Sequence, residues 1–89
     1  MAIVHFTARL GSVGPGKPTE IDCQTVGDAL TKIFAQHPQV QGYVLDEQGR
    51  LRKHVCIFLD GERIAHETAL SMAAGPRSEI YVMQALSGG

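Results

Sequence analysis

Hydrophobic and polar residues alternate over residues 3–10, at the start of the chain. Val4, Phe6, Ala8 and Leu10 fall on one side of this pattern. Because successive side chains of a strand point to opposite faces, the alternation predicts a half-buried β-strand. Residues 11–18, GSVGPGKP, are dense in turn-forming residues, and a second short strand is predicted over residues 19–23. The chain is therefore expected to begin with a β-hairpin.

An amphipathic helix is predicted next, from apolar residues that recur at helical spacing. The recurring residues are Val26, Ala29, Leu30, Ile33 and Phe34. Thr25 has the character of a helix N-cap, with Asp28 as its capping partner. Pro38 disfavours helical geometry in the residue before it, so the helix should end near His37.

The rest of the chain predicts short extended segments joined by turns. They are an extended piece at 43–45, a turn at 46–49, a strand at 54–59, a hairpin turn at Asp60-Gly61, a return strand at 62–64, a connecting turn at 69–76 and a last strand at 79–86. In the last strand, Ile80 and Val82 should face inward. Asp-Gly is favoured in two-residue hairpin loops, which makes the turn at residues 60 and 61 the clearest of these signals.

One helix among these strands can cover only one face of a single sheet, which predicts an α+β two-layer domain. The order of elements matches the β-grasp fold, a mixed sheet of four to five strands with one main helix packed on one face. In that fold the last strand returns beside the first, in the middle of the sheet. We expect a β-grasp domain over residues 1–86 and a flexible tail over residues 87–89.

The sequence ends in Gly88 and Gly89, directly after the last predicted strand. A tail without side chains can enter a narrow cleft and adopt backbone angles closed to other residues. The carboxylate of Gly89 is therefore the candidate working group. The alternative is an ordinary frayed end or an added remnant.

Size and composition favour a carrier or binding module over a self-sufficient enzyme. The 89 residues suffice for one domain, and 44% are hydrophobic and 19% charged, as in ordinary globular proteins. A net charge of −1 argues against a nucleic-acid partner, and Arg50, Arg52 and Lys53, the only basic cluster, are interpreted as a solvated loop. No apolar run is long enough to cross a membrane.

Two cysteines, Cys23 and Cys56, follow no apolar N-terminal signal stretch, so free thiols in a reducing cytoplasm are expected. Nothing in the sequence lowers the pKa of either thiol or supplies a base for nucleophilic catalysis. His54 and Cys56 share one face of the predicted strand at i, i+2, and His5 could lie nearby. Without a tight Cys/His pair this is weak support for a zinc or copper site, and we expect no metal. The glycine-rich loop lacks the spacing of a nucleotide-binding loop.

Three segments resemble the prokaryotic ubiquitin-like sulfur carriers. They are TVGDAL at 25–30, GRLRKHVCIFLDGERI at 49–64 and EIYVMQALSGG at 79–89. This family includes the small subunit of molybdopterin synthase, the thiamin sulfur carrier and the cysteine-synthesis sulfur carrier. The middle segment is most similar to the cysteine-type carriers. The chain departs from the family pattern at residues 75–78, GPRS, and at Gln84, which puts the identity of the partner in doubt.

The resemblance implies that a partner does the chemistry on the tail. An E1-type adenylating enzyme would use ATP to activate the Gly89 carboxylate, next to Gly88, and sulfur would replace AMP to give a thiocarboxylate. A cysteine synthase-like enzyme or another sulfur transferase would then accept the sulfur, for cysteine, a cofactor or a secondary metabolite. A metalloprotease that trims the chain or releases the product is a further implied partner. The chain itself would bind no cofactor.

Alternative functions remain open at this stage. They are a protein modifier that forms an isopeptide bond through Gly89, the small subunit of molybdopterin synthase, and a pure interaction or regulatory domain.

Strand alternation places Cys56, Phe58, Tyr81 and Met83 on the sheet face that the helix does not cover. An exposed apolar face of this kind usually marks a protein contact. We expect Phe58, Tyr81 and Met83, together with Leu86 and Ser87 beside the tail, to bind the partner. The alternative is that loops cover part of this face.

Overall fold

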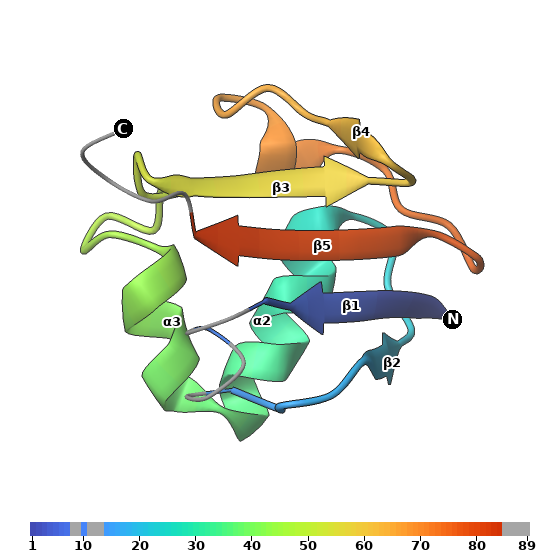
Figure 1. Cartoon of the computed structure of the whole chain (residues 1–89), viewed down its shortest axis with the longest axis horizontal. Helices are drawn as coiled ribbons and strands as arrows, with labels where there is room; N and C mark the ends of the chain where they lie inside the picture. The colour runs from blue at the N-terminus through green and yellow to red at the C-terminus, as the bar shows by residue number, and fades with distance from the viewer. Residues whose placement is uncertain (8–9, 11–13, 85–89) are drawn as a thin grey trace.

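The computed structural model of the chain describes residues 1–7, 10 and 14–84. Its strands and helices are β1 (Ala2–Phe6), β2 (Thr19–Ile21), α2 (Val26–Gln36), α3 (Pro38–Val44), β3 (Val55–Leu59), β4 (Glu62–Arg63), the 3-10 helix η1 (Ala69–Ser71) and β5 (Glu79–Gln84). The strands form one five-stranded sheet in the order β2-β1-β5-β3-β4 (Figure 1). This is the predicted α+β, β-grasp arrangement.

The last strand, β5, lies in the centre of the sheet as predicted. It runs parallel to β1, with Val4 opposite Ile80 and Phe6 opposite Val82. It runs antiparallel to β3, with Ile57 also opposite Val82. β1 pairs with residues 79–82 and β3 with residues 80–84, so β5 has a hydrogen-bonded neighbour on both sides over residues 80–82.

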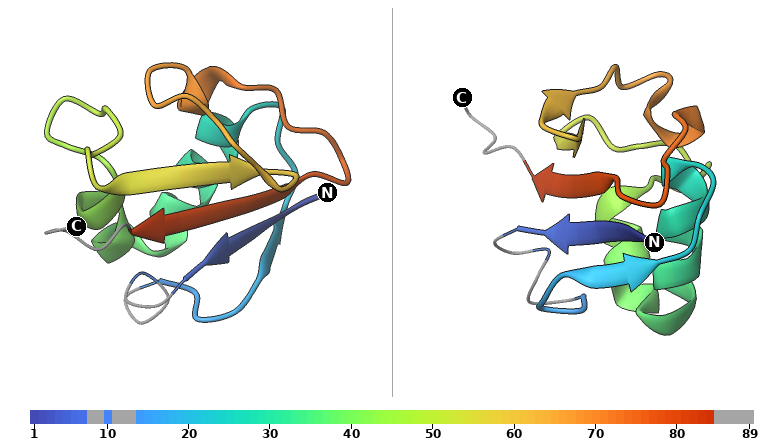
Figure 2. Two further views of the ribbon diagram at one scale, coloured as in Figure 1. Left: turned by 45° about the horizontal axis from the view of Figure 1, so that its top comes forward. Right: turned by 90° about the vertical axis from the view of Figure 1, so that its right-hand side faces the viewer.

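Helices α2 and α3 cover the same face of the sheet, and in the described part of the chain the opposite face carries no helix (Figure 2). The core fills the space between the two layers. It is built from the predicted inward-facing residues Val4, Val26, Ala29, Leu30, Ile33, Phe34, Val55, Ile57, Ile80 and Val82. All of these side chains are buried, so both the strand faces and the helix face were predicted correctly.

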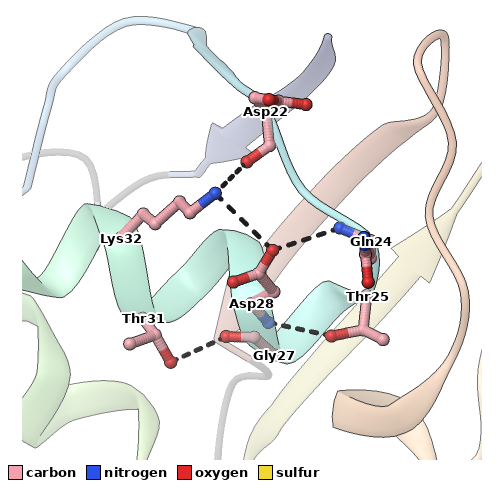
Figure 3. Close-up of polar contacts among 7 residues, drawn as sticks. All are labelled: Asp22, Gln24, Thr25, Gly27, Asp28, Thr31 and Lys32. Carbon is pink, nitrogen blue, oxygen red and sulfur yellow. Dashed lines mark hydrogen bonds and ion pairs between the residues drawn. The ribbon is translucent and has the colours of Figure 1, made fainter.

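The start of α2 is fixed by the predicted cap (Figure 3). The Asp28 amide donates to Thr25 Oγ1 at 3.0 Å, and Asp28 Oδ2 accepts from the Gln24 amide at 3.1 Å. The reciprocal bond thus reaches the residue before the N-cap rather than the N-cap itself. Lys32, one turn further on, lies 3.7 Å from Asp28 Oδ2 and donates to the Asp22 carbonyl. The helix ends at Gln36, as Pro38 predicted.

The extended piece expected at residues 43–45 is wrong for residues 43 and 44, which belong to a second helix, α3, while Leu45 is extended and forms a β-bridge with Leu51. Pro38 ends α2 but occupies the first turn of α3, where its missing N–H costs nothing. Val40 and Val44 lie four residues apart on one face of α3, and both are buried. Burial of this face explains why the second helix forms.

The strands are shorter than their hydrophobic patterns predicted. The first strand ends at Phe6, and the Leu10 amide donates to the Thr7 carbonyl at 3.0 Å, so the chain turns instead of extending to residue 10. Leu10 is nevertheless fully buried, which is why its apolar character continued the strand pattern. The connecting turn predicted at 69–76 contains η1, and residues 85 and 86 of the last predicted strand lie outside the described residues.

Two of the predicted turns, at residues 46–49 and 60–61, are confirmed. Asp60 and Gly61 both have positive φ, 53° and 87°, as the two-residue hairpin loop between β3 and β4 requires. Asp60 Oδ1 also accepts the Glu79 amide at 2.8 Å, which ties this loop to the start of β5. In the turn that begins at Asp46, the Arg50 and Gln48 amides donate to the Asp46 carboxylate and hold its pKa below the usual value.

Within the described residues, no helix has the length and apolar character needed to cross a bilayer.

The close approach of α2 to η1 predicts opposite effects for two glycine-to-alanine substitutions. A Cβ at Gly27 would lie 2.7 Å from the Leu70 carbonyl oxygen, whereas a Cβ at Gly42, in α3, would meet nothing within 4 Å. Gly27→Ala should lower the free energy of unfolding by about 1 to 2 kcal/mol, a usual cost of overpacking. Gly42→Ala should raise it by up to about 1 kcal/mol, because alanine favours a helix. Urea unfolding of both variants measures the difference, and a change of the same sign in both would contradict the packing.

Candidate functional site

The predicted working residues at the end of the chain, Gly88 and Gly89, lie outside the described residues, as do Leu86 and Ser87. Their roles, and the boundary between a domain at 1–86 and a tail at 87–89, stay predictions. The structure does describe the strand that precedes them. Gln84, the last residue of β5, lies opposite Val55, the first residue of β3. The chain thus reaches residue 84 at the end of the central strand, beside β3, while the pairing with β1 ends at Val82.

The predicted contact residues lie together on the face of the sheet without helices. Phe58 lies directly opposite Tyr81, and Cys56 lies directly opposite Met83, in the β3–β5 ladder. All four are half-buried. We call Cys56, Phe58, Tyr81 and Met83 the open-face cluster. It occupies β5, which leads to residue 84, and the neighbouring strand β3.

Sequence reasoning missed the closest neighbour of this cluster, His5 of β1. His5 lies opposite Tyr81 in the parallel β1–β5 ladder. Their rings stack with centroids 4.1 Å apart and planes 3° apart. Strand alternation places His5 on the face opposite Val4, but only the parallel register, which the sequence does not specify, reveals that it meets Tyr81. The sequence suggested His5 only as a weak metal ligand.

The weak metal hypothesis placed His54 and Cys56 on one strand, but only Cys56 is in it. The strand begins at Val55, so His54 belongs to the preceding turn. Among the residues that the structure describes, no three His, Cys, Asp or Glu side chains come close enough to hold a metal ion.

The two cysteines are free thiols, as expected. Burial raises the pKa of the Cys23 thiol, and the carboxylates of Asp28 and Asp22 raise it further, against the opposing effect of Lys32. Because the thiolate is the nucleophile, this environment disfavours Cys23 as a reactive group at neutral pH.

Two members of the basic cluster serve the local structure. Arg50 lies 3.6 Å from the Asp46 carboxylate across the turn at 46–49. Arg52 Nε donates to the Gly42 carbonyl at 2.9 Å and so ties this loop to α3. Lys53 is exposed. These contacts agree with the interpretation of the cluster as a loop on the surface.

A cavity of about 510 Å³ lies between this loop and the segment around η1. Its lining includes Asp46, Arg50, Lys53, His66 and Glu67. Acidic and basic groups are balanced there, so the lining favours no single class of ligand. The cavity does not include the open-face cluster.

Comparison with known proteins identifies relatives that match almost the whole chain. No protein-family model matches the sequence. Small archaeal modifier protein 1 of Haloferax volcanii is 29% identical over 85 residues, which make up 92% of this chain and 93% of that protein. Its crystal structure matches with a TM-score of 0.80 at 27% identity, over 99% of this chain and 98% of the other. The chain is a homologue of small archaeal modifier protein 1.

A second similarity concerns the fold alone. A chain in the crystal structure of the Amycolatopsis orientalis BexX/CysO complex matches all of this chain with a TM-score of 0.86, at 16% identity. Mycobacterium tuberculosis CysO matches with a TM-score of 0.83 at 17% identity, over 97% of this chain and 100% of the other. The chain therefore has the fold of these proteins, which is the fold that the resemblance to the ubiquitin-like carriers implied.

The position of the open-face cluster predicts a larger effect on binding than on stability. We expect Phe58→Ala or Tyr81→Ala to weaken affinity for an activating or acceptor enzyme, the partners that the resemblance implies, by at least about 1 to 2 kcal/mol, as truncated interface aromatics commonly do. Adding a Met83 substitution should weaken it further. Calorimetric affinity and melting temperature, measured on the same variants, separate a contact from a packing role.

Tyr43→Ala is the matched control, because Tyr43 is an aromatic residue of α3 with 48% exposure, in the helical layer. It should leave the affinity unchanged. Unchanged affinity in both sheet-face variants would refute the contact surface.

Proposed function

We propose that the protein is a sulfur carrier that presents the Gly89 carboxylate to partner enzymes. The observation that carries the proposal is the central position of β5, whose sequence continues directly into the Gly-Gly end. Homology to small archaeal modifier protein 1 and the shared ubiquitin-like fold support it. The chain acts as a co-substrate of its partners rather than as an enzyme.

Activation must come first, because a free carboxylate would have to expel oxide. An E1-type adenylating enzyme joins the Gly89 carboxylate to the α-phosphate of ATP and releases pyrophosphate. Hydrosulfide then attacks the carbonyl carbon. The new C–S bond forms as the C–O bond to AMP breaks, AMP leaves with the electron pair, and the remaining S–H proton passes to solvent. The product is a C-terminal thiocarboxylate, and ATP stays a ligand of the partner.

The dimensions of the chain suit a mechanism in which the domain docks on the partner and the partner supplies the chemistry. An extended chain covers at most about 3.5 Å per residue, so residues 86–89 could reach about 14 Å into a partner while the domain docks outside. Ordering such a tail costs about 1 to 2 kcal/mol per residue in lost backbone freedom. Contacts of the open-face cluster with the activating enzyme offset that cost.

The sulfur acceptor is proposed from fold similarity to CysO. A cysteine synthase-like enzyme, or another sulfur transferase of cofactor or secondary-metabolite synthesis, takes the sulfur from the thiocarboxylate. A metalloprotease that releases the product is the third partner. The free thiols of Cys23 and Cys56 are compatible with a location in the reducing cytoplasm.

A second function, protein modification, is favoured by one specific observation, the homology to a small archaeal modifier protein. In this function a lysine amine, rather than sulfide, attacks the activated Gly89 carbonyl and forms an isopeptide bond. The activation step is the same, so the two functions differ only in the acceptor.

Incubation with an E1-type adenylating enzyme of the source organism, ATP and sulfide should convert the protein to a thiocarboxylate at Gly89. Intact-mass spectrometry should show the exchange of one oxygen for sulfur, located in the C-terminal peptide. The variant without Gly89 is the control and should remain unmodified at unchanged melting temperature, because an exposed terminus contributes little packing. A mass gain that maps to Cys23 or Cys56, or normal adenylation of the truncated chain, would contradict the proposal.

The same spectrometry distinguishes the modifier function when proteins of the host are added with ATP. Arg77 is the last lysine or arginine of the chain, so trypsin would leave residues 78–89 attached to a modified lysine. Detection of that branch supports protein modification, and its absence alongside the thiocarboxylate supports the carrier alone.

A further inference from the structure

We propose that His5 is a positioning residue of the docking face, which holds the ring of Tyr81 in the orientation that meets the activating enzyme, and that Glu79 holds His5 in turn. This inference rests on the proposed function. It adds β1 to a docking surface that the sequence predicted only on β3 and β5.

Tyr81 is the central member of a row of three rings across the sheet. His5 on β1 lies opposite it on one side, and Phe58 on β3 lies opposite it on the other. The imidazole of His5 stacks on the phenol ring at a centroid distance of 4.1 Å, with the planes 3° apart. A parallel stack at this distance restricts the rotation of the tyrosine ring.

The imidazole of His5 is itself held in place by the carboxylate of Glu79. His5 Nε2 lies 3.1 Å from Glu79 Oε1, on the strand that carries Tyr81. The His5 side chain is 20% exposed and the Glu79 side chain 52% exposed. The more exposed carboxylate of Glu79 therefore holds the less exposed imidazole of His5, and this imidazole packs on one face of the Tyr81 ring.

Fixing a ring before binding has a consequence for affinity. A side chain that is already in its bound orientation loses less freedom on association, so the same contact yields tighter binding. Tyrosine is among the residues that most often dominate interfaces. Loss of the stack should therefore weaken docking without removing any group that touches the partner.

A double-mutant cycle tests this coupling in binding to an E1-type adenylating enzyme of the source organism. His5→Ala should weaken the affinity about fivefold in the wild-type background and less than about twofold in the Tyr81→Ala background, a coupling typical of residues in contact. In the wild-type background, His5→Ala should also raise KM for the carrier and leave kcat at saturation unchanged. Equal effects in both backgrounds would overturn the proposal.

Conservative variants separate positioning from direct contact. His5→Phe keeps an aromatic ring on Tyr81 and should restore most of the affinity that His5→Ala loses. Glu79→Gln keeps a hydrogen-bonding oxygen and should cost less than His5→Ala. A His5→Phe variant that binds as weakly as His5→Ala would show that the imidazole contacts the partner directly, which contradicts a positioning role.

A measurement on the free protein distinguishes failure of this inference from failure of the proposed function. In the NMR spectrum, the Tyr81 ring protons should show an upfield ring-current shift that His5→Ala removes and His5→Phe retains. Absence of this shift in the wild type would overturn the stack, whatever the activating enzyme does. If the shift is present and the protein is activated, but His5→Ala binds normally, the positioning role fails and the carrier function stands.

Discussion

The parallel pairing of β1 with β5 is the constraint on which the rest of the structure depends. It joins residues 3–6 to residues 79–82, so the chain between them must include a crossover on one face of the sheet. Parallel neighbours need such a crossover, and here α2 and α3 supply its covered layer. The pairing puts the end of the described chain at the middle of the sheet and leaves the other face without helices. A covered core, a sheet face that α2 and α3 leave open and a central last strand all follow from this pairing.

A second set of contacts holds the start of α2 in place. The amide of Val26 donates to the Met72 carbonyl at 3.0 Å, and the amide of Ala74 donates to the Gln24 carbonyl at 3.0 Å. These bonds clamp the start of α2 to the segment after η1, where Gly27 permits the close approach. Because the core and these backbone hydrogen bonds hold the helical layer, substitutions on the open face should leave the fold intact. A loss of affinity after such a substitution can then be assigned to lost binding contacts.

The elements that local chemistry specifies were predictable from the sequence. The Thr25 cap, the buried face of α2 and the Asp60-Gly61 turn each depend on residues close together in the chain. The central position of β5 came from the order of elements and from the rules that limit how sheets connect. Residue alternation was also sufficient to place Phe58, Tyr81 and Met83 on one face.

The predictions that were wrong concern segments whose local structure depends on tertiary contacts. Leu10 is buried, so its apolar character extended the alternating pattern of the first strand. In the structure, however, Leu10 packs into the core after a turn and is not part of the strand. Helix α3 is short and forms against the core through Val40 and Val44, which a seven-residue window cannot reveal. His5 could not be matched with Tyr81, because nothing local sets the register of strands so far apart in sequence.

The central claim is that the free carboxylate of Gly89 is the group on which partners act. The most direct measurement is ATP–pyrophosphate exchange by the E1-type adenylating enzyme, with the protein prepared either with a free C-terminal carboxylate or with a C-terminal amide at Gly89. The amide removes only the reacting oxygen and leaves the fold and the docking face unchanged. We predict exchange with the carboxylate form and none with the amide form, although both bind the enzyme. Exchange that proceeds equally with both forms would contradict the claim.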